Sequence, residues 1–313
     1  MTLHVVATRV GGPEVLELVD RPDREPGVGE IQVDVRAVGV NPVDFKRYGG
    51  TYAPADFPLT LGSEAAGAVR AVGPDAVGPR GPVSVGDEVI LFRIDDAYSE
   101  RVTVPASAAV PKPPGMPWPE ASGLMLTGAT AVHGLAAVDA GPGDTVLFHN
   151  ASGGVGIMAV QIGVGRGVRM IGTASEANHE FLRSLGAEPV AYGPGLLDRV
   201  RAIAPGGVDA AIDGIGTPEA LDVSQALVAN PARFVTIVAT PAAFEAGIKV
   251  LGGAPGADPG TEIRMAARLE LVDLVAAGKL EVFVERMFPL QDVADAHREV
   301  AAGHVRGKLA LIP

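Results

Sequence analysis

The segment from Thr145 to Gly165 constrains the fold more than any other. The apolar run TVLFHN leads directly into ASGGVG, and an apolar stretch with helical spacing follows. A strand, a glycine-rich turn and a helix in this order are typical of a dinucleotide-binding βαβ unit, in which the helix N-terminus faces a pyrophosphate. A turn that only packs helix on strand is the alternative, but the second strand VRMIGTA lies at the right interval. We expect cofactor contacts from the whole turn: Ala151, Ser152, Gly153, Gly154, Val155 and Gly156.

The rest of the region after residue 120 alternates apolar strands with helices. Strands are expected over 188–192, 208–215, 232–239 and 248–253, with a helix over 218–229. Strands that are apolar throughout are typical of a parallel sheet covered on both faces. This pattern predicts an α/β Rossmann domain with a doubly wound parallel sheet.

The first 110 residues have a different pattern, in which short strands are separated by Gly, Pro and Asp clusters. We expect an all-β domain there, a surface loop over 73–86 and no regular structure in the proline-rich segment 111–120. The C-terminal region predicts helix, strand, helix and a closing strand, KLALIP, that returns to the N-terminal domain. The expected domains are 1–118, 119–265 and the returning segment 266–313.

Cofactor choice in a Rossmann domain depends on the end of the second strand, where an acidic residue binds the ribose 2′-hydroxyl of NAD. Ala174 best matches that position, and Ser175 follows it. His179 and Arg183 share a helix face that could approach a 2′-phosphate, although a solvated face is the other reading. The acidic Glu176, two residues after Ala174, is also close enough to occupy that position. We expect NADPH rather than NADH.

Composition excludes several classes of function. The chain has 313 residues, which is more than one core usually holds, and it has no cysteine for disulfides, thiolate nucleophiles or Cys-ligated metals. Its formal charge is −12 and no Lys or Arg cluster offsets it, which argues against nucleic acid and anionic membrane surfaces. There is no signal-like N-terminus and no apolar run of membrane-spanning length, so we expect a cytoplasmic protein.

The segments GVNPVDFKRYGG, LGSEAAGAV, ASGGVG and GKLALIP, in this order, resemble the zinc-independent quinone oxidoreductases of the medium-chain dehydrogenase/reductase superfamily. The resemblance covers essentially the whole chain. It implies a β-rich, GroES-like catalytic domain, a Rossmann domain, a cofactor between the two, and a homodimer formed through the Rossmann domains.

The zinc-dependent alcohol dehydrogenases of the same superfamily hold catalytic zinc with Cys, His and Cys. The matching positions here are Asn41, Ser63 and Gly123, so we expect no metal. Alcohol oxidation would lose its Lewis acid, whereas reduction of a quinone or an activated alkene leaves a delocalised phenolate or enolate and needs less help.

The resemblance places Asn41, Asp44 and Tyr52 in the substrate pocket beside the nicotinamide. Asn41 would hold the carboxamide or a substrate oxygen, and Tyr52 would stack on a flat ring and offer its hydroxyl. The alternative for Asn41 and Asp44 is a turn that satisfies its own backbone. For Glu64, a buried ion pair and a catalytic acid both stay open. Lys308 would reach the cofactor or remain solvated.

Further cofactor contacts are implied by the resemblance or by the position of strand ends. Mid-helix Thr127 and Thr130 match nicotinamide contacts, although such residues often bond back to their own helix. Tyr192 matches a contact at the 2′-phosphate end, or else caps its strand. Ligands of open α/β sheets bind at the carboxyl ends of the strands, which adds Val238, Ala239, Leu251 and Gly252. His133 and His149 lie on apolar stretches and are expected to be core histidines.

These observations predict a metal-free reductase that transfers hydride from NADPH to a quinone or an α,β-unsaturated carbonyl compound. Two alternatives stay open. One is an enoyl reductase that acts on thioesters, and the other is a cofactor-binding protein with little turnover, because a glycine turn explains binding whether or not chemistry follows.

Overall fold

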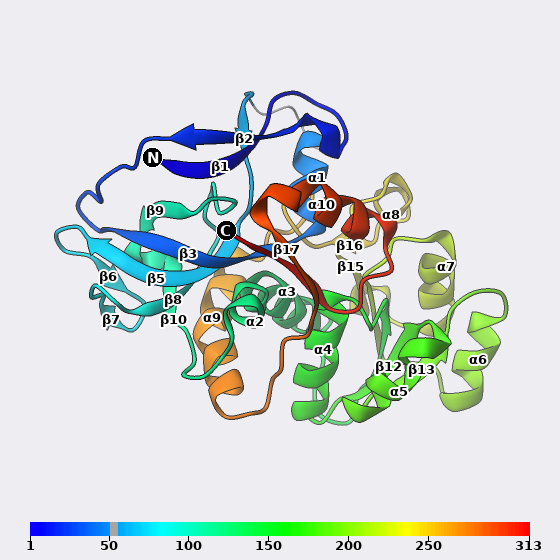
Figure 1. Cartoon of the computed structure of the whole chain (residues 1–313). Coiled ribbons are helices and arrows are strands. Elements are labelled where there is room, and N and C mark those ends of the chain that lie inside the picture. Colours follow the sequence, from blue (N-terminus) through cyan, green and yellow to red (C-terminus); the bar gives the residue numbers. More distant parts are fainter. Residues whose placement is uncertain (51–55) are drawn as a thin grey trace. The chain divides into compact units, whose positions relative to one another are not determined.

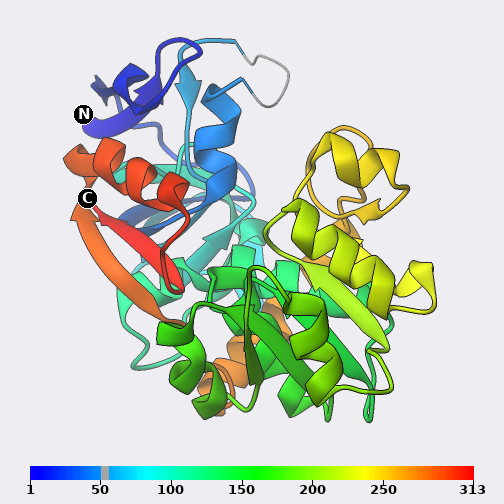
Figure 2. The ribbon, with the colours of Figure 1, turned by 90° about the vertical axis from the view of Figure 1, so that its right-hand side faces the viewer.

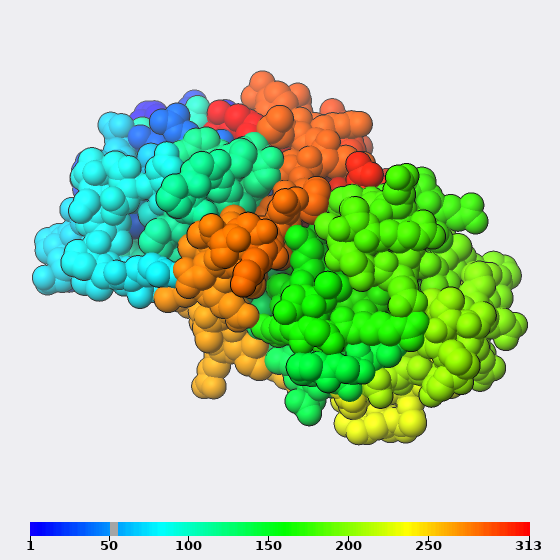
Figure 3. All heavy atoms as spheres, turned by 90° about the horizontal axis from the view of Figure 1, so that it is seen from below, coloured from blue at the N-terminus to red at the C-terminus, as the bar shows by residue number. Residues whose placement is uncertain are grey.

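The structure, a computed structural model, describes residues 1–50 and 56–313, and these form two compact units. Unit 1 consists of Met1–Leu126, Arg268–Gly278 and Val282–Pro313, and unit 2 of Thr127–Ala267 and Lys279–Glu281. In Figures 1 and 3, unit 1 is mostly blue to teal and orange to red, and unit 2 is mostly green to yellow. The C-terminal strand therefore belongs to the same unit as the N-terminus.

Unit 1 is built on β-sheet. Its largest sheet has the strand order β10-β8-β5-β3-β18-β17, with β9 also paired to β3, and a smaller sheet has the order β2-β1-β4. The final strand pairs antiparallel with β3, with Leu309 opposite Val40, and parallel with β17. The strands are β1 (Thr2–Ala7), β2 (Leu16–Arg21), β3 (Glu30–Val40), β4 (Leu59–Thr60), β5 (Glu64–Val72), β6 (Val77–Gly78), β7 (Gly81–Pro82), β8 (Glu88–Phe92), β9 (Arg101–Pro105), β10 (Ala109–Pro111), β17 (Val284–Pro289) and β18 (Lys308–Ile312).

The prediction of an all-β pattern over residues 1–110 is wrong at α1 (Pro42–Tyr48). Asn41 is the N-cap of this helix, Pro42 occupies its first turn, and the side chains of Asn41 and Asp44 form a capping box with each other's backbone N–H. Proline in the first turn and a capping box are strong helix-start signals. Asn41 and Asp44 therefore do satisfy local backbone groups, as the alternative proposed, but they do so at a helix start and not in a turn.

Two smaller expectations for unit 1 also need correction. The segment 73–86 contains the two-residue strands β6 and β7, which pair antiparallel. The segment 111–120 is not free of regular structure, because α2 (Trp118–Ser122) begins inside it. Pro119 lies in the first turn of α2, where a missing N–H costs nothing. The remaining helices that contribute to this unit are α9 (Thr261–Ala276) and α10 (Val293–Ala302).

Unit 2 has a six-stranded parallel sheet with the order β13-β12-β11-β14-β15-β16. This is the strand order 3-2-1-4-5-6 of a doubly wound dinucleotide-binding sheet, so the predicted fold class is confirmed. The strands are β11 (Thr145–His149), β12 (Arg169–Ala174), β13 (Glu188–Ala191), β14 (Ala210–Asp213), β15 (Phe234–Thr236) and β16 (Lys249–Val250).

Helices cover the sheet of unit 2 on both faces, as right-handed crossovers require (Figures 1 and 2). One face is packed by Leu196 and Val200 of α6 and Leu221 of α7, which share a core cluster with Leu147 and Ile171 of the sheet. The sequence reading missed α6 and the short α8. The helices are α3 (Leu124–Ala137), α4 (Gly154–Gly165), α5 (His179–Ser184), α6 (Leu196–Ile203), α7 (Pro218–Leu227) and α8 (Pro241–Glu245).

Across the described residues, no helix is both long enough and apolar enough to cross a bilayer.

Candidate functional site

The start of α1 in unit 1 holds two of the predicted substrate-pocket residues. Asp44 Oδ2 accepts a hydrogen bond from the backbone N–H of Asn41 at 2.9 Å and another from the Tyr98 hydroxyl at 2.9 Å. Burial raises the pKa of Asp44 to about 6, against the lowering effect of these two donors and of the nearby Lys308 charge. Asp44 is thus a buried acceptor that joins α1 to the rest of unit 1. Tyr52, the third predicted residue, lies outside the described residues.

The Asn41 side chain is held by a buried ion pair. Its amide oxygen accepts from Lys308 Nζ at 2.5 Å, and its amide nitrogen donates to Glu64 Oε1 at 2.9 Å and to the Gly39 carbonyl at 3.2 Å. Lys308 and Glu64 are themselves 3.2 Å apart, and both are buried. Both amide hydrogens of Asn41 are therefore engaged, and its orientation is fixed.

These contacts decide what the sequence left open for the two charged residues. Glu64 forms the buried ion pair, and its second oxygen accepts from the backbone N–H of Leu126 at 2.8 Å. Lys308 is not solvated, because its ammonium donates to Asn41, to Glu64 and to the Val40 carbonyl at 2.8 Å. The expectation of a solvated Lys308 was wrong because the C-terminal strand places the side chain inside the unit, whereas a contact of Lys308 with the cofactor stays a prediction.

At Asn41 and Gly123, two of the three positions matched to zinc ligands, the residues present do not fit a metal. The Asn41 oxygen is already bonded to an ammonium group. Gly123 offers no donor atom, and a Cβ at that position would lie 3.2 Å from Cε of Lys308. A second cation beside Lys308 would be repelled. Within residues 1–50 and 56–313, no group of three or more His, Cys, Asp or Glu side chains is arranged to hold a metal ion.

A cluster of three rings, Tyr48, Tyr98 and His297, lies next to Asp44 and was missed from the sequence. The Tyr48 hydroxyl is 2.7 Å from Nδ1 of His297, and the Tyr98 hydroxyl is 2.9 Å from Nε2. All three rings are buried. Burial lowers the pKa of His297 to about 4, and burial together with the Asp44 charge raises the pKa of Tyr98 well above its usual value. No spacing in the sequence links residues 48, 98 and 297, so no local signal could have found them.

The glycine turn of unit 2 has the geometry that its sequence predicts. Gly153 is the N-cap of α4, and no side chain caps the helix there. A Cβ at Gly156 would lie 2.4 Å from the carbonyl oxygen of Asn150 and 2.6 Å from Cα of Ala151, so only glycine allows this approach. Because the first N–H groups of a helix have no partner within it, this turn fits a pyrophosphate.

The carboxyl ends of neighbouring strands support this turn with buried polar side chains. Asn150 has a positive φ of 65° and donates from its backbone N–H to Thr173 Oγ1 at 3.1 Å. His149, also in the core as expected, is 3.0 Å from the hydroxyl of Ser224, and burial lowers its pKa to about 4. His133 is likewise buried, with its Nδ1 accepting from Arg264 at 3.2 Å. The Asn150 and His149 contacts lie directly before the turn, whereas His133 belongs to α3.

Two of the residues predicted for the 2′-phosphate end, Ser175 and Tyr192, directly follow adjacent strands. Ala174, the last residue of β12, is in register with Ala191 of β13, so Ser175 and Tyr192 follow neighbouring strand ends. His179 Nε2 is 3.4 Å from the Ala174 carbonyl oxygen. Tyr192 is 58% exposed, which leaves its side chain accessible at this strand end.

The remaining predicted cofactor residues lie on α3 and at the ends of β15 and β16. The backbone N–H of Val238 donates to Thr236 Oγ1 at 3.0 Å, and that of Leu251 donates to the Thr236 carbonyl at 2.8 Å. Ala239 follows Val238 and is half-buried, and the Gly252 N–H donates to the Asp258 carbonyl at 2.8 Å. Thr127 and Thr130 are buried on α3. All of these cofactor assignments stay predictions.

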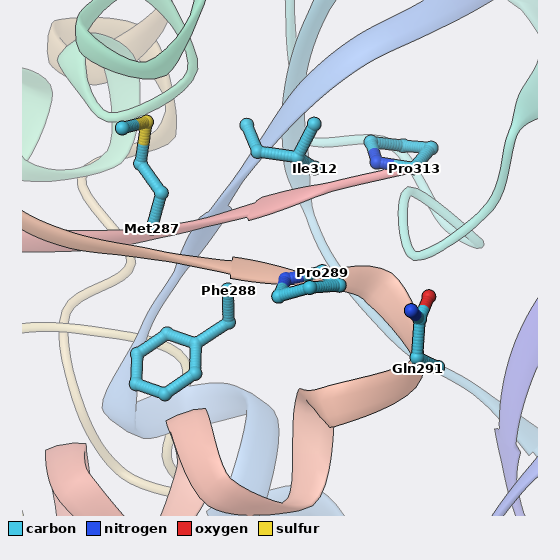
Figure 4. Close-up of a pocket in the computed structure, with 6 residues that line it drawn as sticks. All are labelled: Met287, Phe288, Pro289, Gln291, Ile312 and Pro313. Carbon is cyan, nitrogen blue, oxygen red and sulfur yellow. The ribbon is translucent and has the colours of Figure 1, made fainter.

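A shallow groove of about 420 Å³ lies along β17 and β18 in unit 1, and no predicted site residue lines it. Its lining is apolar except for one amide, that of Gln291 (Figure 4). The residues that line it are Met287, Phe288, Pro289, Gln291, Ile312 and Pro313. The groove has no charged group or catalytic side chain, so we assign it no role.

Comparison with known proteins identifies the family. Residues 27–114 match the alcohol dehydrogenase GroES-like domain, and residues 185–311 match a family described as zinc-binding dehydrogenase.

A quinone oxidoreductase of Pseudomonas aeruginosa is 32% identical, with 100% of both chains covered. The structure of the Escherichia coli quinone oxidoreductase complexed with NADPH is 27% identical, with a TM-score of 0.86 and coverage of 99% of this chain and 100% of that one. The CurK enoyl reductase structure is 27% identical, with a TM-score of 0.85 and 99% of both chains covered. The chain belongs to the quinone oxidoreductase family of the medium-chain dehydrogenase/reductase superfamily.

Proposed function

We propose that this protein is an NADPH-dependent, zinc-independent reductase that delivers hydride to a quinone or an α,β-unsaturated carbonyl compound. The observation that carries the proposal is the uncapped N-terminus of α4 at Gly153, which follows β11 at the centre of the parallel sheet. The family relationship supports the same conclusion, because relatives include quinone oxidoreductases and a structure complexed with NADPH.

Residues of unit 2 would hold the cofactor. The turn Ala151–Gly156 would face the pyrophosphate with backbone N–H groups, and Ser175 and Tyr192, at neighbouring strand ends, would approach the 2′-phosphate. When bound, NADPH supplies the hydride and its two electrons. Val238, Ala239, Leu251 and Gly252, with Thr127 and Thr130, would contact the nicotinamide end. His179 would add a donor near Ser175.

Residues of unit 1 would orient the acceptor. Asn41 and Asp44 stand at the start of α1, where buried contacts fix them, and Tyr52 follows the helix in the sequence. We infer that this segment shapes the substrate pocket and that Tyr52 offers its hydroxyl to the oxygen on which negative charge develops. Lys308 supports zinc independence, because its ammonium contacts Asn41 and its side chain lies next to Gly123, two of the positions that would carry metal ligands.

The direct test is NADPH consumption by the purified, EDTA-treated protein with phenanthrenequinone, with NADH in parallel. We expect turnover that prefers NADPH and that added zinc does not increase. The same assay on Ser175→Asp should shift the preference towards NADH, because a carboxylate repels a 2′-phosphate. Turnover that requires zinc, or an absence of turnover with both cofactors, would contradict the proposal.

A second candidate, an enoyl thioester reductase, is favoured by the similarity to the CurK enoyl reductase structure. The two functions are distinguished by the substrate that the protein reduces. Consumption of NADPH with crotonyl thioesters of coenzyme A and pantetheine, but not with quinones, would establish the second. NADPH binding without consumption of any acceptor would instead indicate a cofactor-binding protein with little turnover.

We also propose that the protein acts as a homodimer, as the family resemblance implies. Light scattering after size exclusion measures this directly. A mass of about 31.9 kDa, that of one chain, would contradict it.

A further inference from the structure

His297 lies at the centre of the buried ring cluster of Tyr48, Tyr98 and His297, although it comes from α10, more than 240 residues after α1. The planes of His297 and Tyr48 are within 4° of parallel, with ring centroids 5.7 Å apart. The Tyr98 ring meets His297 edge-on at 5.5 Å, and Phe45 does so at 6.5 Å. His297 itself is 0% exposed. Rings packed on several sides allow this imidazole little freedom to rotate.

The hydrogen bonds of the cluster can run in only one direction when Asp44 is ionised. A carboxylate accepts but cannot donate, so Tyr98 must donate its hydroxyl proton to Asp44 Oδ2. The Tyr98 oxygen then accepts from Nε2 of His297. A neutral imidazole carries one N–H, so Nδ1 must accept from the Tyr48 hydroxyl. Burial, which lowers the pKa of His297 to about 4, keeps the ring neutral at pH 7.

We propose that His297 is a positioning residue for the predicted substrate segment: its neutral ring, protonated on Nε2, aims the Tyr98 hydroxyl at Asp44 and so holds Asn41 and the start of α1 in place. The effect on turnover rests on the proposed function, whereas the direction of the hydrogen bonds does not depend on it. His297 acts through Tyr98 and Asp44 and contacts neither substrate nor cofactor.

Tyr98 can serve as a fixed reference because its own position does not depend on α1. Its backbone N–H donates to the Leu61 carbonyl at 3.0 Å, and its carbonyl accepts from Val5 at 2.9 Å. Gly62, with a φ of 85°, leaves room for the ring, since a Cβ there would lie 2.5 Å from Cδ1 of Tyr98. The cluster therefore ties α1 to the β-rich frame through Tyr98 and to α10 through Tyr48.

The charged groups around Asp44 act on it from three sides. Lys308 of β18 favours the ionised form and Glu64 of β5 opposes it, while Tyr98 and the Asn41 N–H donate to Oδ2. Among the described residues, Asp44 Oδ1 has no hydrogen-bond partner. A proton taken up at low pH would therefore bind Oδ1. The bonds at Oδ2 would weaken without any exchange of partners.

The first test is nitrogen-15 NMR of the histidine rings in the wild-type protein at pH 7. We expect a neutral His297 with a pyrrole-type Nε2 and a pyridine-type Nδ1, assigned by the loss of these signals in His297→Gln. A Nδ1-protonated ring, or a positively charged ring, would overturn the proposal regardless of whether the protein reduces quinones. This measurement needs no variant to retain activity.

The second test compares His297→Phe, His297→Gln and, as a matched control, His304→Phe, which replaces an exposed histidine just after α10. A small displacement of positioning groups costs about tenfold to a hundredfold in rate. We expect a loss of that size in kcat/KM for the acceptor in His297→Phe, an unchanged Kd for NADPH, substantial rescue by Gln, whose amide can accept and donate, and no effect in the control.

The third test uses Tyr98→Phe, which removes one of the two donors to Asp44 Oδ2 but keeps the ring. The acid limb of the kcat/KM profile should move to higher pH, because the ionised carboxylate loses a hydrogen bond. Carbon-13 titration of the Asp44 carboxyl should move with it. Full kcat/KM in His297→Phe, or an unmoved titration in Tyr98→Phe, would overturn the proposal. If wild-type protein reduces neither quinones nor enones, the proposed function fails, and the NMR titration still decides this inference.

Discussion

The glycine turn of unit 2 and the buried contacts around α1 in unit 1 are built in opposite ways. The turn uses consecutive residues, 151–156, and the groups it would offer to a cofactor are mostly backbone N–H groups. The contacts around α1 use side chains from positions 41, 44, 64, 98, 297 and 308. The first region depends on the absence of side chains, and the second on their exact chemistry. Substitutions should therefore damage the two regions by different mechanisms.

The largest expected effect is in the ion pair of unit 1. Lys308→Met would leave Glu64 buried without its cation, which costs about 3–5 kcal/mol of unfolding free energy. The double variant Lys308→Met/Glu64→Gln removes the orphaned charge and should recover much of the loss. Urea denaturation of the three proteins checks this. A single variant as stable as the wild type would show that the pair is not buried as described.

In unit 2 the corresponding change is Gly156→Ala. Its Cβ would meet backbone atoms of Asn150 and Ala151, so helix and strand must separate at a cost of about 1–3 kcal/mol, with weaker NADPH binding. Gly165→Ala, in the same helix, meets no atom within 4 Å and is the matched control. It should leave the Kd for NADPH unchanged. Calorimetric titration and thermal unfolding measure both, and equal losses in the two variants would refute the steric explanation.

Lowering the pH from 6.5 to 5 should destabilise unit 2 more than unit 1. His149 in unit 2 has its pKa lowered to about 4. Its contribution to the unfolding free energy is therefore complete above the ordinary pKa of histidine, and it decreases by about 1 kcal/mol for each pH unit below that value. In unit 1, His297 acts in the same direction, but Asp44, with its pKa raised to about 6, gains stability as pH falls and offsets it. Hydrogen exchange, corrected for the intrinsic rate, should show β11 amides losing more protection than β3 amides. Equal losses would contradict this.

The smallest effect is expected for a charged pair on the surface of α10. Arg298 and Asp295 are 2.5 Å apart, but their side chains are 56% and 66% exposed. Solvent screens such a pair, so Asp295→Ala should change the unfolding free energy by less than about 0.5 kcal/mol. Arg298 is next to His297 in the sequence. Comparing this exposed pair with the buried contacts of His297 therefore tests the effect of burial at nearly the same place on α10. A loss of several kcal/mol in urea denaturation would show that the helix, rather than the buried contacts, controls stability here.

Sequence reading succeeded where the signal was local. The order of strands and helices in unit 2 followed from hydrophobic periodicity, and the turn followed from its small residues. It failed at α1, although Asn41, Pro42 and Asp44 carry both a capping box and a first-turn proline, because the surrounding β pattern was extended across them. It also missed α6, which is only eight residues long. These were errors of reading, since the signals were present.

The surroundings of Asn41 and Asp44 could not have been read in the same way. The resemblance supplied the two positions, but no sequence signal near them predicts that Tyr98 and His297 are their partners. Lys308 was expected at a cofactor or in solvent, and the pairing of β18 with β3 placed it beside Asn41. The partners of a buried polar group are set by which strands and helices meet, and that depends on the whole fold.

The sequence by itself determined the parallel sheet, the glycine turn and the family of this protein, because periodicity, small residues and motif order act over short stretches of chain. Tertiary structure alone decided that Asn41 is held by a Lys308–Glu64 ion pair and that Asp44 receives the Tyr98 hydroxyl beside His297. The physical reason is the cost of burying polar groups. Each one must find a partner inside the fold, and the partner is whichever side chain the packing brings within about 3 Å.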